Sequence, residues 1–207
     1  MGKPKLPKLW IEYEVKDKDG KLLDKGKIKS QSWVGNIIAL ISCLFNIWGT
    51  GVSSYVSTAS RSDLIDTSNT ARPLRIAVSS ATIAMGGNAP AGETTAGIVV
   101  GSSNTPVAIG QYSLQALIAH GTGAGQLQYG ATTVDPIVKT ATTWTLRIIR
   151  TFTNGSGATV TVYELGLYLK VCFDGQTIML ARDVPATPIT VPDASTLTLR
   201  YIISHTV

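Results

Sequence analysis

The stretch that most constrains the fold runs from Thr142 to Lys170 and reads TTWTLRIIRTFTNGSGATVTVYELGLYLK. Two runs rich in Thr, Val, Ile, Leu and aromatic residues flank the turn sequence Asn154-Gly155-Ser156-Gly157. Strand-length runs divided by residues that tolerate positive φ predict an antiparallel β-hairpin. In the second run the apolar phase changes near Val162-Tyr163, which predicts a β-bulge or a strand buried on both faces. A hairpin with an apolar face needs a second layer, so we expect the rest of the chain to supply one.

From Arg72 onward the chain is β in character, with turn residues between short apolar runs. Many short strands at about ten-residue spacing predict a mainly β fold, an antiparallel β-sandwich of the jelly-roll or Greek-key type. We expect strands near Leu74–Ala84, Ala96–Val100, Val107–Ile109, Leu114–Ala119, Leu127–Tyr129, Trp144–Phe152, Thr159–Val171, Thr177–Arg182, Ile189–Val191 and Thr196–Ser204.

The N-terminal part predicts a β-hairpin and one apolar α-helix. Leu9–Ser32 alternates around the turn Asp17-Lys18-Asp19-Gly20, which predicts the hairpin. Apolar residues at helical spacing predict a helix from Trp33 to Trp48, too short for the roughly 20 residues of a membrane span. We therefore divide the chain into residues 1–50 (arm, hairpin and helix, for anchoring or oligomerisation), 51–71 (linker) and 72–207 (β-sandwich).

The charge is unevenly distributed along the chain. Residues 1–29 hold nine lysines and five acids, while the net charge of all 207 residues is +5. Within the predicted hairpin the signs alternate, as in a solvated two-stranded ribbon, so that only Lys3, Lys5 and Lys8 form an unopposed basic stretch. Charged residues make up 15% of the chain, below the roughly 25% of typical soluble domains. A surface of Thr, Ser, Ala and Gly favours packing against other subunits over an ordinary secreted β-sandwich.

No pattern of catalytic or metal-binding residues is predicted. His120 and His205 have no Cys, Asp or Glu at ligand spacing, so we expect neither a metal nor another cofactor. Glu164 lies in an apolar strand near Arg147, Arg150 and Arg182 in the likely sheet, which favours a half-buried Glu–Arg pair that orders the sheet over a catalytic carboxylate. The N-terminus does not read as a signal peptide, and we find no basic stripe or recognition helix for nucleic acid.

Several segments resemble structural proteins of tailed viruses and their prophages. They are Gly97–Gly101, Ile118–Gly121, Gln126–Tyr129, Arg150–Asn154, Glu164–Tyr168, Ala181–Val184 and Leu197–Tyr201, and the E-L-G-L-Y stretch is similar to segments of tail-fibre and baseplate proteins. The resemblance covers about residues 95–204 and, more loosely, the N-terminal hairpin and helix, and it implies a virion component, made in the host cytoplasm. It carries over no catalytic residue.

These observations lead to a non-enzymatic virion protein, a capsid decoration or tail component, whose partners are copies of itself and other virion proteins. The expected assembly contacts are Lys3, Lys5 and Lys8 of the arm and Trp33, Ile37, Leu40, Leu44, Phe45 and Trp48 of the helix. One alternative is a receptor- or glycan-binding tail-tip module with its site in the loops of Gly121, Thr122 and Gly123 and of Asn154, Gly155 and Ser156. A cellular surface-filament subunit is the third hypothesis.

Overall fold

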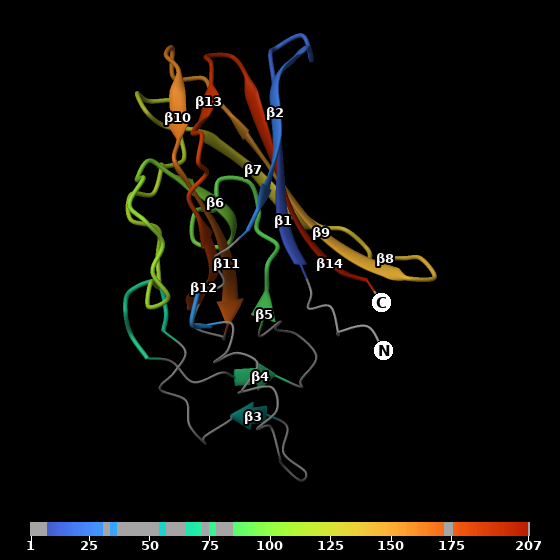
Figure 1. The fold of residues 1–207 in the computed structure, drawn as a ribbon. Helices are drawn as coiled ribbons and strands as arrows, with labels where there is room; N and C mark the ends of the chain where they lie inside the picture. The colour runs from blue at the N-terminus through green and yellow to red at the C-terminus, as the bar shows by residue number, and fades with distance from the viewer. Residues whose placement is uncertain are drawn as a thin grey trace.

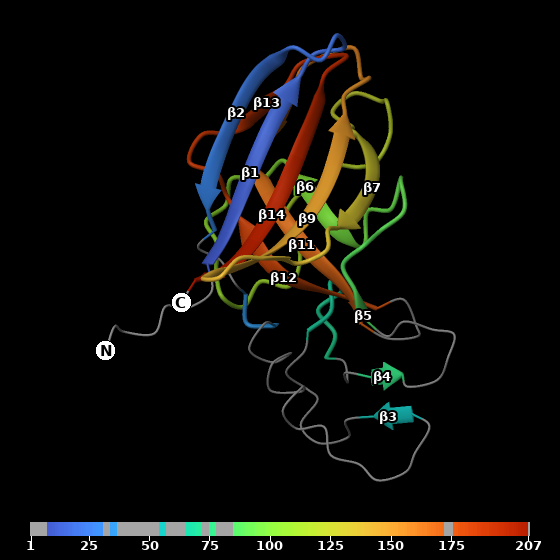
Figure 2. The same cartoon turned by 90° about the vertical axis from the view of Figure 1, so that its right-hand side faces the viewer.

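The computed structural model describes residues 8–30, 34–36, 54–56, 65–71, 75–77, 85–171 and 176–206. These residues form a mainly β fold in which all paired strands run antiparallel, as the sequence predicts. Figures 1 and 2 show the arrangement from two directions.

The larger sheet has the strand order β2-β1-β14-β9-β7, and the short strand β8 also pairs with β9. Its central strand, β14, pairs with β1 on one side and with β9 on the other, along almost its whole length. The strands are β1 (Lys8–Lys16), β2 (Leu22–Lys29), β7 (Gln128–Val134), β8 (Val138–Lys139), β9 (Thr143–Thr153) and β14 (Thr196–Thr206).

The smaller sheet has the strand order β12-β11-β5, and β6 also pairs with β11. Its strands are β5 (Met85–Gly86), β6 (Gly97–Gly101), β11 (Glu164–Val171) and β12 (Thr177–Asp183). Two further strand pairs complete the fold: β10 (Val160–Val162) with β13 (Ile189–Val191), and β3 (Ser54–Val56) with β4 (Arg75–Ala77). In Figure 1, β10, β13, β6, β11 and β12 lie opposite the larger sheet.

One cluster of buried apolar side chains joins the two layers. Ile11, Phe152 and Leu199 of the larger sheet belong to it together with Val99 and Leu165 of the smaller sheet. Because each sheet has an apolar face that must leave water, burying both faces against each other stabilises the fold as a unit.

The N-terminal hairpin forms as predicted and is built into the larger sheet. Asp17 Oδ1 accepts hydrogen bonds from the backbone N–H groups of Asp19 (3.0 Å) and Lys21 (2.9 Å), and Gly20 closes the turn at φ 81°. β1 pairs with β14 from Lys8↔Ser204 to Lys16↔Thr196, and Ile11 and Val15 are fully buried. The hairpin and the last strand along the sequence therefore share one sheet.

The predicted hairpin of Thr142–Lys170 is wrong. β9 pairs with β14, β7 and β8, whereas β10 pairs with β13 and β11 pairs with β12, β5 and β6. The loop after Thr153 thus carries the chain from the larger sheet to the opposite layer. The predicted phase change does occur: the strand is interrupted at Tyr163, and residues 164–168 of β11 are buried on both faces.

Two expected strands are also wrong, because residues 107–109 and 114–119 form no strand. Leu117, within the second range, and His120, directly after it, form only isolated bridges. Of the predicted helix from Trp33 to Trp48, only residues 34–36 lie among those described, so the helix stays a prediction.

Candidate functional site

The most strongly polar cluster in the described core joins Glu164 of β11 to Arg182 of β12. Both side chains are 0% exposed, and Arg182 Nε lies 2.6 Å from Glu164 Oε2. The sequence prediction of a Glu–Arg pair is therefore confirmed, with Arg182 as the partner. The expected half-burial is wrong, because both side chains are fully buried. Arg147 and Arg150, the other two arginines considered, do not contact Glu164 through an ion pair.

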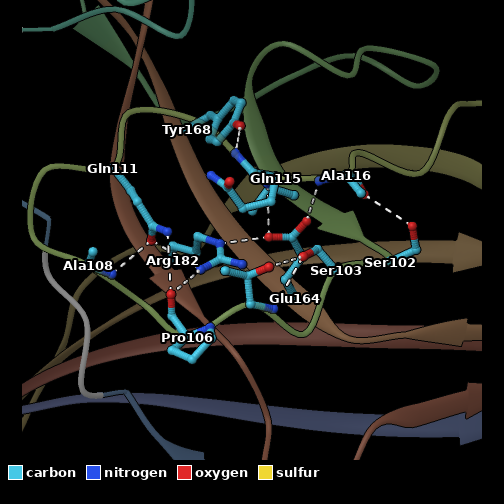
Figure 3. Close-up of polar contacts among 12 residues, drawn as sticks. Ser102, Ser103, Pro106, Ala108, Gln111, Gln115, Ala116, Glu164, Tyr168 and Arg182 are labelled. Carbon is cyan, nitrogen blue, oxygen red and sulfur yellow. Dashed lines mark hydrogen bonds and ion pairs between the residues drawn. The ribbon is translucent and has the colours of Figure 1, made fainter.

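The rest of the cluster holds a long loop against the smaller sheet, as Figure 3 shows. The backbone N–H groups of Gln115 and Ala116 donate to the two carboxylate oxygens of Glu164, at 3.1 and 2.7 Å. Arg182 Nη1 donates to Gln111 Oε1 at 3.0 Å. The N–H groups of Gln115 and Ala116 thus occupy both oxygens of a carboxylate without solvent access, so Glu164 anchors this end of the loop, while Arg182 holds Gln111.

Two neighbouring residues fit the same arrangement. The Tyr168 hydroxyl accepts a hydrogen bond from the backbone N–H of Leu114 at 2.7 Å, and burial raises the pKa of Tyr168 to about 12. At Gly101 of β6, a Cβ atom would lie 2.6 Å from the carbonyl oxygen of Ala116 and would also meet the Glu164 side chain. The close approach of loop and strand thus requires glycine at this position.

A second buried cation, Arg150 of β9, is held by backbone carbonyl groups. Its guanidinium donates to the carbonyl oxygens of Gly130 (2.8 Å), Ala96 (3.0 Å), Ile98 (2.8 Å), Pro90 (3.3 Å) and Glu93 (2.6 Å). The guanidinium also lies 4.8 Å from the centre of the Tyr129 ring. Burial lowers the pKa of Arg150 to about 10, so the group stays charged at neutral pH. These contacts fix the segment before β6 to the larger sheet.

The structure brings the two predicted ligand loops together. A Cβ atom built on Gly155 would lie 3.6 Å from the methyl group of Thr122 and 3.5 Å from Gln128 Oε1. Gly123 donates its backbone N–H to Gln126 Oε1 at 2.9 Å, and Gly121 also lies against that side chain. The two loops therefore lie against each other.

Within this pair of loops, Asn154 is structural. It is fully buried, and its Nδ2 donates to the carbonyl oxygens of Val191 (2.7 Å) and Ala158 (2.8 Å). Its Oδ1 accepts from the backbone N–H (3.0 Å) and the hydroxyl (2.8 Å) of Ser156. Because every polar group of the amide is engaged, Asn154 has nothing left to offer a ligand.

Of the expected assembly residues, only Lys8 belongs to the described part of the chain. It is exposed at the start of β1, opposite Ser204 of β14. Lys3, Lys5, Trp33, Ile37, Leu40, Leu44, Phe45 and Trp48 lie outside the described residues, and their assignment stays a prediction.

Sequence reasoning missed an apolar ribbon formed by residues 134–144, which contain the end of β7, β8 and the start of β9. Val134, Ile137, Val138 and Trp144 are each between 44% and 55% exposed. Lys139 Nζ lies 4.3 Å from the centre of the Trp144 ring and covers part of it. Figure 1 shows this ribbon projecting from the body of the molecule. Its Val and Ile residues fall between the expected strands Leu127–Tyr129 and Trp144–Phe152, where the sequence predicts no strand.

Sequence reasoning also missed an open groove on the outer face of the larger sheet. The groove has a volume of about 460 Å³. Its lining residues come from four strands and include Trp10 and Glu12 of β1, Lys27 of β2, Arg147 of β9, and Arg200 and Ser204 of β14. Their alternation along each strand is visible in the sequence, but only the placement of β14 between β1 and β9 brings them together.

The groove carries two ion pairs on its β1 side. Lys27 Nζ lies 2.9 Å from Glu12 Oε1 and 5.2 Å from the centre of the Trp10 ring. Arg200 Nη1 lies 3.3 Å from Glu14 Oε1. Arg147, on the opposite side, is exposed and forms no side-chain hydrogen bond or ion pair within the residues that the structure describes.

No group of His, Cys, Asp and Glu side chains among the described residues has the geometry of a metal site. In the same part of the chain, no helix combines the length and the apolar character needed to cross a membrane. Comparisons with protein-family models, curated proteins and solved structures give no match to this chain.

Proposed function

We propose that this chain is a non-enzymatic structural protein of a tailed-virus particle, which assembles with copies of itself and with other virion proteins. The proposal rests on the segments that resemble virion proteins and on the apolar ribbon of residues 134–144. Exposed apolar side chains gathered on a projecting segment are typical of surfaces that become buried on association. Its location would be the virion, after synthesis in the host cytoplasm.

The two facing layers with their shared core support a further classification of the body. We infer an antiparallel β-sandwich of the jelly-roll or Greek-key type, in which the chain crosses between layers at Asn154. The buried ionisable side chains Glu164, Arg182 and Arg150 hold loops in place, which suits a structural role.

Assembly is tested by the mass of the protein in solution, measured by light scattering. We expect the full chain to form a defined oligomer with a mass that is a multiple of the 21.9 kDa monomer. Trp144→Asp should reduce that mass, because a charge would have to be buried at the contact. Leu23→Asp is the matched control, since Leu23 is 45% exposed but lies in the hairpin of β1 and β2, away from the ribbon.

A full chain that is monomeric at every concentration up to its solubility limit would contradict the assembly function. If Trp144→Asp leaves the mass unchanged, the ribbon is not the contact. In that case Leu44→Asp tests the other expected contact, the predicted helix. A charge in that helix should abolish assembly, while circular dichroism should still show a folded β-body.

The binding-module hypothesis is the second candidate, and a particular observation favours it. The groove on the outer sheet face combines an aromatic side chain, hydroxyl groups and cations on a rigid floor. It lies on the sheet face, whereas the sequence reading places the ligand site in the end loops.

A further inference from the structure

We propose that the groove on the outer face of the larger sheet binds a carboxylated saccharide, with Arg147 holding the carboxylate and Trp10 stacking against a sugar ring. The groove volume of about 460 Å³ falls within the range of small-ligand sites, which is roughly 300–1,000 Å³. This inference does not depend on the assembly function, because the groove and the apolar ribbon are separate surfaces.

The register of the larger sheet fixes the spacing of the two residues. Trp10 lies opposite Ile202, and Ile202 lies opposite Arg147, so the three form one row across adjacent strands. Neighbouring strands are about 4.8 Å apart, which places the backbones at Trp10 and Arg147 about 10 Å apart. An aromatic surface and a cation are thus separated by an apolar floor on a hydrogen-bonded sheet, whose geometry needs no rearrangement on binding.

Arg147 is the cation that is free to take a ligand. The other cations of the groove, Lys27 and Arg200, are paired with Glu12 and Glu14. Arg147 has no such partner in the described part of the chain, although it lines the groove. A guanidinium presents two parallel N–H donors that match the two oxygens of a carboxylate.

The remaining groups favour a saccharide over a phosphate chain. Thr143, Thr145 and Ser204 supply hydroxyl groups that can both donate and accept hydrogen bonds, which suits the hydroxyl groups of a sugar. With Lys27 paired to Glu12 and Arg200 paired to Glu14, Arg147 is left as the unpaired charge among the residues that line the groove, which suits a ligand with one carboxylate at this position better than a closely spaced polyanion. The half-buried Trp10 ring offers a flat apolar surface with a polar edge, which suits the apolar face of a sugar ring.

Isothermal titration calorimetry on the full chain tests this proposal. The probes are trigalacturonate, a hyaluronan tetrasaccharide and sialyllactose, with maltotriose as the uncharged saccharide and a hexamer of thymidine as the phosphate polyanion. We expect at least one carboxylated probe to bind more tightly than maltotriose and than the oligonucleotide. Arg147→Gln should lower the affinity for that probe about tenfold, because it removes the charged hydrogen bonds between the guanidinium and the carboxylate of the probe.

The matched control is Lys18→Gln, which removes one positive charge at the exposed turn between β1 and β2, outside the groove. It should leave the affinity within about twofold, since exposed charges separated by more than about 10 Å are largely screened in salt. Trp10→Leu should lower the affinity for the saccharide, whereas Trp10→Phe should retain most of it, because Phe keeps an aromatic face for the sugar ring.

Three results would overturn the proposal. No carboxylated probe binds more tightly than maltotriose; or Arg147→Gln and Lys18→Gln weaken binding equally, which indicates general charge attraction; or the oligonucleotide binds more tightly than every saccharide.

Discussion

The Glu164–Arg182 pair makes the sharpest prediction about stability. Glu164→Gln keeps the size of the side chain but replaces one acceptor oxygen by an NH₂ group. In the unchanged protein, three groups donate hydrogen bonds to the Glu164 carboxylate: the N–H groups of Gln115 and Ala116, and Nε of Arg182. With one amide oxygen left, at least one of these donors faces another donor, and the buried charge of Arg182 loses its counter-ion.

The expected loss follows from the burial of both partners. Removing one partner of a fully buried ion pair costs about 3–5 kcal/mol, because the other charge stays in the interior uncompensated. Both side chains here are 0% exposed, so solvent does not screen the loss. For a chain of this size the corresponding decrease in Tm is about 6–20 °C. Since most domains are stable by only 5–15 kcal/mol, the variant would lie close to the limit of folding.

The measurement is the free energy of unfolding from urea denaturation, supported by the Tm from calorimetry. Glu12→Gln serves as the control, since Glu12 forms an exposed ion pair with Lys27 and should lose less than about 1 kcal/mol. If Glu164→Gln costs no more than Glu12→Gln, the cluster does not contribute to stability and our interpretation of it fails.

A double variant, Glu164→Leu with Arg182→Met, separates charge neutralisation from loop anchoring. Replacing a buried ion pair by apolar residues is often neutral when the two charges only compensate each other. Here the N–H groups of Gln115 and Ala116 would lose their acceptor, at about 1–3 kcal/mol for each buried unsatisfied group. We therefore expect the double variant to stay destabilised, and full recovery would show that the pair does not anchor the loop.

Three further predictions concern the other buried and strained positions. Arg150→Met should lower the free energy of unfolding by about 3–5 kcal/mol, because several carbonyl groups lose their donor; a loss below 1 kcal/mol in urea denaturation would contradict this. Gly97→Ala and Gly125→Ala both place a side chain at positive φ, which costs about 1–2 kcal/mol, but only Gly97 lies against a neighbouring side chain of β7; equal Tm values for the two variants would contradict the packing. Hydrogen bonds from Thr95 lower the pKa of Glu93 from 4.5 to about 2, so this group's contribution to stability is complete above pH 4.5 and is lost as the pH falls toward 2. Between pH 4.5 and about 2, the Tm of Glu93→Gln should therefore fall less than the Tm of the unchanged chain. Parallel curves of Tm against pH would contradict the lowered pKa of Glu93.

The sequence was sufficient to predict the local features of the fold. Alternation around Asp17–Gly20 predicts the N-terminal hairpin, and the phase change near Tyr163 predicts the buried β11. A glutamate within an apolar strand predicts a basic partner, because an unpaired buried carboxylate would be too costly. Local composition carries each of these predictions.

The pairing of strands distant in sequence could not be predicted in the same way. Asn154-Gly155-Ser156-Gly157 has the composition of a hairpin turn, but Asn154 is held by Val191, which lies on the opposite layer. The groove depends on the register between β1, β14 and β9, which is set by contacts between the two ends of the sequence. Side-chain alternation assigns a residue to a face and does not say which strands lie beside it.

The central place of β14 has a consequence for how the protein is made. Until residues 196–206 leave the ribosome, β1 and β9 each present a free strand edge, and the apolar faces of the larger sheet lack their middle row. The larger sheet therefore closes only after β14 has been synthesised, and its closure joins parts of the chain that are distant in sequence. A chain without residues 196–206 would keep both edges open as templates for pairing with other chains, so its expected failure is aggregation.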